Sequence, residues 1–129
     1  MNVYRSHKEL VSDMVRCRKW IQGALDKGND THDFEHIVQG VLAGDMQFWA
    51  NDRCCAVTEI VVYPKKKVIH GFLVGGNLDG LSELHENAIK WAKELGCTDF
   101  TMLGRRGWLK VMPEYGWEDL NQNVMVKRL

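Results

Sequence analysis

The feature that most constrains the fold is a strand, glycine turn, helix and strand in the second half of the chain. Residues 68–74 are rich in β-branched and apolar side chains, which is typical of a buried strand. Two glycines follow, and residues 81–95 then carry apolar side chains at helical spacing up to Gly96. Residues 99–103 predict another strand. Strands that alternate with helices predict a mixed sheet with helices against its faces.

Two amphipathic helices are expected at the start of the chain. Ser6 and Glu9 form a Ser-x-x-Glu capping box, which marks a helix start. The residues that follow carry apolar side chains at helical spacing as far as Leu25. A second helix is expected from residue 30 or 31 to Gly44, because the segment repeats an i, i+3, i+4, i+7 apolar stripe.

A β-hairpin is expected between these helices and the strand at 68–74. Residues 54–63 are rich in β-branched side chains and predict its first strand, while Pro64 and the lysines after it predict a charged turn. A shorter strand is expected at residues 46–49. We therefore expect an α/β (α+β) fold in which a mixed, mostly antiparallel sheet is flanked by helices.

The C-terminal segment predicts a short helix and then more strand. Residues 106–112 fit a helix that Pro113 stops. Residues 117–120 and 123–129 predict either a last hairpin or one strand with a break at Asn121. In both cases the chain is expected to end in a strand.

The composition limits the class of protein. The chain has 129 residues, of which 45% are hydrophobic and 26% charged, and this fits a single globular domain spanning residues 1–129. Seventeen basic and seventeen acidic residues cancel, which argues against general nucleic-acid binding. No apolar run approaches the ~18 residues that span a bilayer, and the N-terminus shows no secretory signal. We therefore expect a soluble cytoplasmic protein without membrane association.

The cysteines and one pair of histidines are the candidates for metal or redox chemistry. The four cysteines form no C-x-x-C pair, and Cys54 and Cys55 would point to opposite faces of a strand. All four are interpreted as small buried hydrophobic residues. His32 and His36 have the i, i+4 spacing of a helical metal pair, but no third ligand is evident nearby. We expect no metal site.

The segment between the strand at 68–74 and the next helix is a candidate phosphate site. The first amides of a helix have no partner within the helix, and the helix dipole favours an anion there. Glycines before the helix let an anion approach the backbone. Glycine turns between a strand and a helix are also common for structural reasons alone, so both interpretations stay open.

This part of the chain resembles the GCN5-related N-acetyltransferase superfamily. The superfamily has a Gln/Arg-x-x-Gly-x-Gly/Ala pattern between a strand and a helix, and residues 77–82 read Asn-Leu-Asp-Gly-Leu-Ser at the matching place. A short helix, a glycine–aromatic turn and a closing strand at residues 108–129 add to the resemblance. Residues 104–108, Gly-Arg-Arg-Gly-Trp, and residues 115–117, Tyr-Gly-Trp, look like bacteriophage-encoded members. The resemblance covers about three fifths of the chain by motif, and implies an acetyltransferase-like domain.

The resemblance implies a site for acetyl-CoA or another acyl-CoA. The strand at 68–74 would bind the pantetheine arm, and the amides of the following loop the pyrophosphate. The implied cofactor-binding residues are Phe72, Val74, Asn77, Gly80, Leu81 and Ser82. Asp79 departs from the superfamily pattern, since a carboxylate in the loop repels a pyrophosphate by about 1 kcal/mol at the surface. Its structural interpretation is an N-cap that accepts from an amide of Leu81 or Ser82.

Catalytic groups are less well marked. The resemblance implies a tyrosine acid about four residues before the closing glycine, where this chain has Met112, which has no proton to give. Tyr115 is the nearest alternative. Glu59 and His70 are candidate bases on the two hairpin strands. Their structural interpretations are an exposed carboxylate paired with a lysine for Glu59 and a cross-strand partner for His70.

Two functions are carried forward. The first is an acyl-CoA-dependent N-acyltransferase that acts on an amine or a protein. The second is a non-catalytic bacteriophage structural or interaction protein on the same fold, in the host cytoplasm or the virion, with a protein partner or a second copy of itself. Trp49 and Trp91 lie off the clearest apolar stripes. If they are exposed, they favour the second function, because exposed aromatic side chains mark interfaces.

Overall fold

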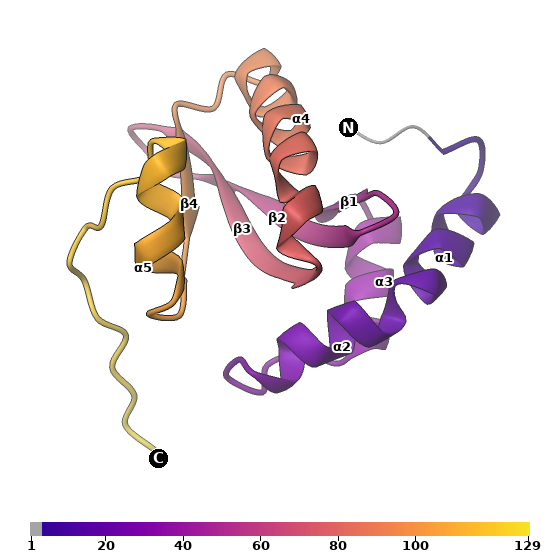
Figure 1. The fold of residues 1–129 in the computed structure, drawn as a ribbon, viewed down its shortest axis with the longest axis horizontal. Helices are drawn as coiled ribbons and strands as arrows, with labels where there is room; N and C mark the ends of the chain where they lie inside the picture. The colour runs from indigo at the N-terminus through magenta and orange to yellow at the C-terminus, as the bar shows by residue number, and fades with distance from the viewer. Residues whose placement is uncertain (1–3) are drawn as a thin grey trace.

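The structure, a computed structural model, describes residues 4–129 and shows one sheet with helices on both faces (Figure 1). The helices are α1 (His7–Arg16), α2 (Arg18–Asp26), α3 (Phe34–Leu42), α4 (Leu81–Glu94) and α5 (Trp108–Val111). The strands are β1 (Met46–Ala50), β2 (Cys54–Val62), β3 (Lys67–Gly76) and β4 (Asp99–Met102). Two 3₁₀ turns, η1 (Leu78–Gly80) and η2 (Met112–Tyr115), adjoin α4 and α5.

The sheet is mixed and mostly antiparallel, as the sequence predicted. Its strand order is β1-β2-β3-β4. β1 pairs with β2 and β2 with β3 in antiparallel fashion, while β3 and β4 are parallel. The parallel pair follows from the helix between them, because a crossover connection returns the chain to the same end of the sheet. The predicted hairpin is confirmed, with β2 and β3 joined by the lysine-rich turn.

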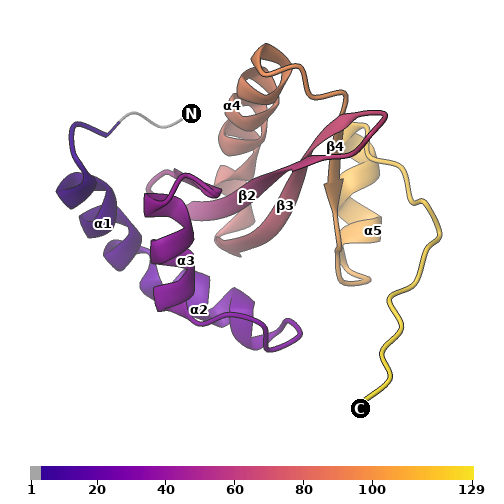
Figure 2. The same ribbon diagram turned by 180° about the vertical axis from the view of Figure 1, so that it is seen from behind.

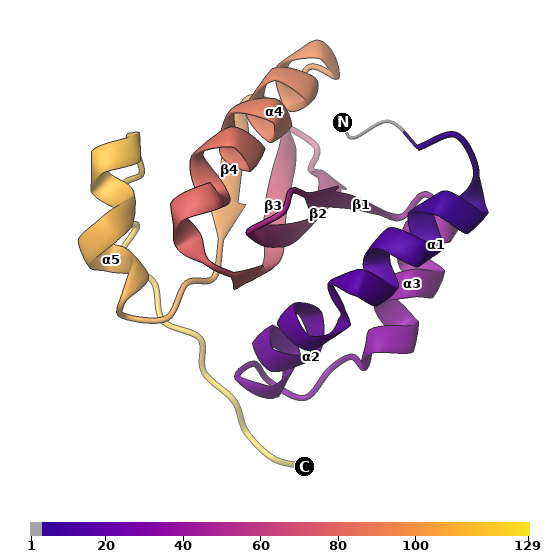
Figure 3. The same ribbon diagram turned by 45° about the vertical axis from the view of Figure 1, so that its right-hand side comes forward.

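Two apolar clusters hold the layers together. α1, α2 and α3 cover one face of the sheet, and α4 covers the other (Figures 1 and 3). Cys55 and Val57 of β2 belong to the cluster under the first three helices, while Cys54 and Ala56 belong to the cluster under α4. This alternation is that of a strand buried on both faces. Cys54 and Cys55 therefore point to opposite faces, as predicted, and both are fully buried.

The first predicted helix is divided in two. Ser6 caps it as expected, since its Oγ accepts from the Glu9 amide at 3.2 Å. The helix stops at Cys17, whose φ of −91° and ψ of 5° separate α1 from α2. Cys17 is fully buried in the core. A straight helix from Ser6 to Leu25 would be about 30 Å long. The two shorter helices instead each bury a side chain in the same apolar cluster, Met14 from α1 and Ile21 from α2.

The second helix starts later than predicted, at Phe34 rather than at residue 30 or 31. Asp33 is its N-cap: its side chain accepts from the backbone of His36, and the His36 ring accepts from the Asp33 amide at 2.9 Å. His32 therefore lies before the helix, so the expected helical pair of His32 and His36 was wrong. Gly44 ends the helix as predicted, with a φ of +82°.

The predicted C-terminal strands are absent from the structure. Residues 117–129 have no strand or helix, and after Trp117 the chain runs away from the body of the protein (Figure 2). The apolar side chains of residues 120–129 are exposed, among them Val124, Met125 and Val126. A strand needs a neighbour for its backbone groups, and none of the described strands pairs with this segment. The short helix α5 ends at Val111, before Pro113, as predicted, although it starts at Trp108 rather than at residue 106. The 3₁₀ turn η2 then continues the segment with Pro113 in its first turn.

No helix in the described part of the chain is long and apolar enough to cross a membrane.

Candidate functional site

The parallel strands β3 and β4 separate halfway along β3. Their pairing runs from Val68 with Asp99 to Gly71 with Met102, and β3 then continues to Gly76 without β4 beside it. The backbone groups of residues 72–76 on that edge therefore face no strand. A gap lined by an unpaired strand edge can bind an extended ligand through main-chain hydrogen bonds.

A β-bulge at Phe72 lies where the two strands separate. Val57 of β2 pairs with Leu73 and Thr58 with Gly71, which leaves Phe72 as the extra residue. Phe72 and Leu73 consequently both pack toward α1, α2 and α3, and Val74 returns to the α4 side. Bulges bend a strand and increase its twist. Phe72 thus helps to direct β3 away from β4.

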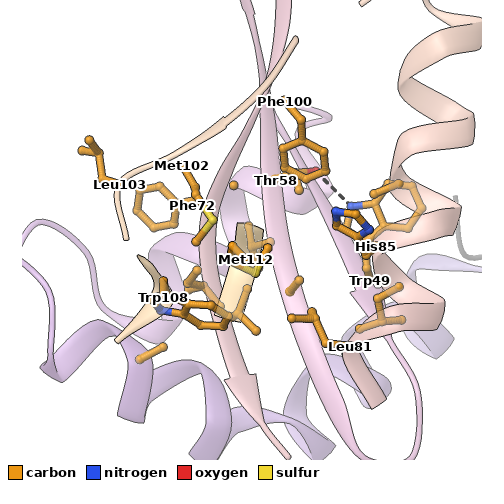
Figure 4. Close-up of a pocket in the computed structure, with 18 of the residues that line it drawn as sticks. Trp49, Thr58, Phe72, Leu81, His85, Phe100, Met102, Leu103, Trp108 and Met112 are labelled. Carbon is orange, nitrogen blue, oxygen red and sulfur yellow. Dashed lines mark hydrogen bonds between the residues drawn. The ribbon is translucent and has the colours of Figure 1, made fainter. Parts of the chain in front are cut away.

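A cavity of about 170 Å³ occupies this gap (Figure 4). β3 lines it with residues 71–74, and the β4 side with Phe100, Met102 and Leu103. α4 forms a further wall, and Trp108 and Met112 of the C-terminal helical segment close another side. Lys27 and Arg105 are the charged residues that line it. The cavity is therefore mainly apolar, with two cationic side chains.

The α4 wall follows from the spacing of the helix. Leu81, Leu84, His85 and Ala88 stand at positions i, i+3, i+4 and i+7, so they share one face, and all four line the cavity. Leu84 and Ala88 are buried and Leu81 and His85 are half-buried. The same stripe that packs α4 onto the sheet thus also forms the wall.

Hydrogen bonds fix the β1–β2 side of the cavity. The Trp49 indole N–H donates to Thr58 Oγ1 at 2.9 Å, and the Thr58 hydroxyl donates to Gln47 Oε1 at 2.9 Å. All three side chains are buried. Trp49 also meets Trp91 edge to face, with ring centroids 5.6 Å apart. Trp49 is fully buried and belongs to the core, so it offers no exposed aromatic surface for an interface.

The surroundings of His85 favour its neutral form. Burial lowers the pKa of His85, and the carboxylate of Glu86 offsets this only in part. The Trp117 indole N–H donates to His85 Nε2 at 2.9 Å, which requires an unprotonated nitrogen at that position. Phe100 and Tyr115 pack around the same ring, with centroids 6.0 and 5.6 Å away. This aromatic cluster ties the C-terminal helical segment to α4 and β4.

The glycine turn before α4 is built by two asparagines. Asn77 Oδ1 accepts from the Asp79 amide at 3.0 Å and so caps η1. Asn51 Nδ2 donates to the Gly80 carbonyl at 2.9 Å, which fixes the turn to the β1–β2 connection. Gly80 is the N-cap of α4 and supplies no side-chain cap. The interpretation of Asp79 as the N-cap of α4 was therefore wrong, and no side chain caps the first turn of that helix.

The candidate cofactor-binding residues fall into two neighbouring groups. Phe72, Val74 and Leu81 line the cavity. Asn77, Gly80 and Ser82 belong to the turn and to the first turn of α4. Leu81 joins the groups, because it both lines the cavity and begins the helix. The turn thus lies at one end of the cavity.

The candidate catalytic residues lie apart from the cavity lining. Glu59 and His70 are direct cross-strand partners on β2 and β3, and His70 Nδ1 lies 2.9 Å from Thr101 Oγ1. Neither residue lines the cavity. Tyr115 contacts the cavity-lining His85 but is itself 45% exposed. Met112, at the position expected for an acid, is buried in the cavity wall.

Sequence reasoning missed three residues of the site. His85 was hidden within an apolar helical stripe, where a histidine four residues after Leu81 was the available signal. Trp108 and Trp117 were expected to be core residues or strand, and their place at the cavity depends on the fold of the C-terminal segment. No group of three or more metal-ligating side chains occurs among residues 4–129.

Comparison with known proteins finds similar folds among solved structures. No protein-family model matches the chain, and no curated protein sequence matches it significantly. Solved structures do match. A ribosomal-protein-alanine N-acetyltransferase from Brucella melitensis biovar Abortus 2308 has a TM-score of 0.68 at 12% identity, over 92% of this chain and 95% of that one.

Two further acetyltransferase structures are similar to the same extent. A predicted acetyltransferase from Clostridium acetobutylicum, solved with acetyl-CoA, has a TM-score of 0.67 at 12% identity, over 95% of this chain and 92% of that one. A Trypanosoma brucei acetyltransferase has a TM-score of 0.65 at 10% identity, over 95% of each chain. At these identities the similarity shows the fold: a single sheet-and-helix architecture shared with solved acetyltransferases.

Proposed function

We propose that the protein is an acyl-CoA-dependent N-acyltransferase of the GCN5-related superfamily. The observation that carries this proposal is the separation of β3 and β4 beside the N-terminus of α4. It places an unpaired strand edge next to a helix start that no side chain caps. An extended pantetheine arm can pair with the strand edge, and the diphosphate can meet the helix amides.

The residues present fit such a ligand. The strand edge at residues 72–76 supplies backbone donors and acceptors in a row. The cavity beside it is apolar, which suits the thioester end, and Lys27 and Arg105 supply positive charge at its rim. One of the structural neighbours was solved with acetyl-CoA. The bacteriophage origin expected from the sequence stays a prediction.

The chemistry of the proposed reaction is a simple acyl transfer. The thioester supplies an activated acyl carbon, to which the acceptor nitrogen forms a C–N bond. The C–S bond breaks with its electron pair on sulfur, and the proton lost by nitrogen ends on the thiolate. Because Met112 has no proton to give, that proton reaches sulfur through solvent, or through Tyr115, whose ring contacts the cavity-lining His85.

Isothermal titration calorimetry with acetyl-CoA tests the proposal, with adenosine as the control ligand. We expect saturable heat for acetyl-CoA and for CoA, and a rise in the thermal midpoint at millimolar ligand. Adenosine alone should give no comparable signal, since it lacks the pantetheine and the diphosphate. Absence of heat and of a thermal shift with both CoA ligands would refute the proposal.

A binding role without catalysis is the second candidate. The exposed apolar side chains of residues 120–129 favour it, together with Met112 in place of an acid. β4 is an edge strand in the described sheet, and the same chain carries both this edge and an unpaired strand-like segment. A second copy of the chain is therefore the partner that this candidate predicts.

A further inference from the structure

The imidazole of His85 is a polar group on the α4 wall of the cavity. It lines the cavity together with Leu81, Leu84 and Ala88 of the same helix, whose side chains are apolar. Figure 4 shows His85 on the α4 side of the space, close to Phe100. Among the α4 residues that line the cavity, His85 is therefore the one whose side chain can form a hydrogen bond with a ligand.

One contact determines which ring nitrogen of His85 carries the proton. The Trp117 indole N–H donates to His85 Nε2 at 2.9 Å, so the lone pair of Nε2 is in use. An indole has a donor and no acceptor, which excludes the reverse arrangement. Burial lowers the pKa of His85, and this favours the neutral ring with a single proton. That proton is consequently on Nδ1.

The Nδ1–H group of His85 has no partner within residues 4–129. The hydrogen bond that the ring forms there is the one at Nε2. No buried side-chain nitrogen or oxygen in the same part of the chain lacks a partner, so Nδ1 is not enclosed by other atoms. The Thr58 hydroxyl, by contrast, accepts from Trp49 and donates to Gln47. The His85 ring thus lines the cavity and keeps one N–H donor free.

Two contacts place His85 beside the point where β3 and β4 separate. Its ring stacks on Phe100, with centroids 6.0 Å apart and an interplanar angle of 19°. Phe100 Cε1 lies 3.5 Å from the position that a Cβ of Gly71 would occupy. Gly71 is the last residue of β3 that pairs with β4. A single side chain, Phe100, therefore connects His85 to the strand separation.

The proposed function puts the thioester at the same point. The diphosphate would lie at the start of α4, and the pantetheine arm along the unpaired edge of residues 72–76. Gly76 is the end of this edge that adjoins η1, and Gly71 lies just beyond the other end. The arm would therefore run from Gly76 toward Gly71. Its far end, the thioester, would lie beside Phe100 and His85.

We propose that His85 Nδ1–H donates a hydrogen bond to the carbonyl oxygen of the thioester. This inference rests on the proposed function and adds a residue to its chemistry. When the acceptor nitrogen attacks, an electron pair moves from the C=O bond onto oxygen, and a donor fixed beforehand stabilises that negative charge. The C=O bond reforms as the C–S bond breaks with its electron pair on sulfur. His85 keeps its proton throughout, as a neutral imidazole can.

¹³C NMR of acetyl-CoA labelled at the thioester carbonyl tests the inference on the full chain and needs no acceptor. A hydrogen bond to the carbonyl oxygen withdraws electron density from the labelled carbon, so its resonance should move downfield on binding. His85→Phe keeps an aromatic ring against Phe100 and should lose at least half of this shift. His85→Asn should keep most of it, because its amide N–H lies near the position of Nδ1.

The two variants form a matched pair. Both lose the acceptor of the Trp117 indole N–H, so both carry the structural cost of that loss. They differ in the donor next to Cγ. No downfield shift in the native chain, equal shifts in the two variants, or a full shift in His85→Phe would overturn the inference and leave the proposed function in place. Failure of both CoA and acetyl-CoA to bind would overturn the proposed function and this inference with it.

Calorimetry separates the thioester from the pantetheine arm, because CoA lacks the carbonyl and acetyl-CoA has it. His85→Phe should lower the ratio of acetyl-CoA affinity to CoA affinity by about fivefold, the effect of one net hydrogen bond. An equal loss of affinity for the two ligands would place the hydrogen bond on the pantetheine arm and overturn the inference. If His85→Phe does not fold, His85→Leu replaces it in both experiments.

¹⁵N NMR of the histidine side chains gives a readout that needs no variant. The ring in contact with the Trp117 indole should have a protonated Nδ1 and an unprotonated Nε2 in the ligand-free native chain. Its Nδ1–H signal should move when acetyl-CoA binds, and move less when CoA binds. The opposite tautomer, or the same response to both ligands, would overturn the inference.

Discussion

Gly75 shows that packing by itself requires a glycine at the end of β3. A Cβ at this position would lie 2.4 Å from the Trp20 carbonyl oxygen of α2, so no side chain fits between β3 and that helix. Gly76 has a φ of +97° and its missing Cβ would meet the Arg53 carbonyl at 2.6 Å. These two glycines therefore bring β3, α2 and the β1–β2 connection together, whether or not a ligand binds nearby.

Replacement of Gly75 by alanine should lower the free energy of unfolding by about 1–3 kcal/mol, because backbone must move to admit the methyl group. Urea unfolding measures the change. Gly23→Ala is the matched control: Gly23 is inside α2 with open space around it, and alanine there should stabilise the protein by about 0.5–1 kcal/mol. A Gly75→Ala protein as stable as the native one would contradict the close approach of β3 and α2.

His85 should give the protein a pH-dependent stability. Burial lowers its pKa below 6.5, so the unfolded chain binds the proton at a pH at which the folded protein does not. Between the two pKa values the unfolded chain carries more protons, and the free energy of unfolding rises with pH. The contribution is complete above pH 6.5 and is lost as the pH falls through that window.

Urea unfolding at a series of pH values from 4.5 to 7.5, on the native chain and on His85→Gln, measures this effect. Subtraction of the two curves removes the titration of the other histidines. We expect the difference to grow as the pH rises to about 6.5 and then to stay level. Parallel curves for the two proteins would show that His85 titrates alike in the folded and unfolded states.

At the scale of elements, α4 has two roles on two surfaces. Its apolar stripe packs on the sheet and lines the cavity, and its first turn follows η1, which Asn77 caps and which Asn51 binds through the Gly80 carbonyl. The η1 turn lets Asn77, and not Asp79, act as the capping side chain. No side chain therefore caps the first turn of α4, although the Leu81 amide already donates to the Leu78 carbonyl of η1.

Replacement of Ser82 by aspartate separates ligand binding from folding. A carboxylate in the first turn of α4 is favourable to the helix dipole, so the free energy of unfolding should stay equal or rise by about 0.3–1 kcal/mol. The same charge repels a diphosphate and should weaken binding of CoA by about 1 kcal/mol, or roughly fivefold. Calorimetry and urea unfolding measure the two effects. Unchanged affinity would place the diphosphate elsewhere.

At the scale of the whole molecule, the C-terminal segment stands apart from a well-packed body. α1, α2 and α3 on one face and α4 on the other enclose both apolar clusters. Residues 118–129 contribute no buried side chain. Exposed apolar side chains in an extended segment are typical of a chain that pairs with a neighbour.

Truncation after Asp119 should leave the thermal midpoint within about 2 °C, since no buried contact is lost. If the segment pairs with a second copy of the chain, sedimentation velocity should show a dimer for the full chain and a monomer for the truncated one. A monomeric full chain would contradict this pairing. A large drop in the thermal midpoint on truncation would instead show that the segment packs on its own sheet.

Local chemistry determined most of the elements. Runs of β-branched residues predicted the strands, Ser6 predicted a helix start, and glycines predicted the ends of α3 and α4. These signals are readable because propensity, capping and left-handed φ values depend on neighbours in sequence. The hairpin and the strand–turn–helix unit were therefore predictable. The break at Cys17 was not, since it depends on the shape of the surface on which α1 and α2 pack.

The cavity was decided by tertiary structure alone. The bulge at Phe72, the end of the β3–β4 pairing at Gly71 and the place of His85 beside Trp117 each depend on contacts between segments far apart in the chain. The C-terminal residues show that a strand predicted from the sequence can also fail to form. Their sequence favours a strand, but a strand forms only where another strand accepts its hydrogen bonds, and that partner is not encoded in the segment itself.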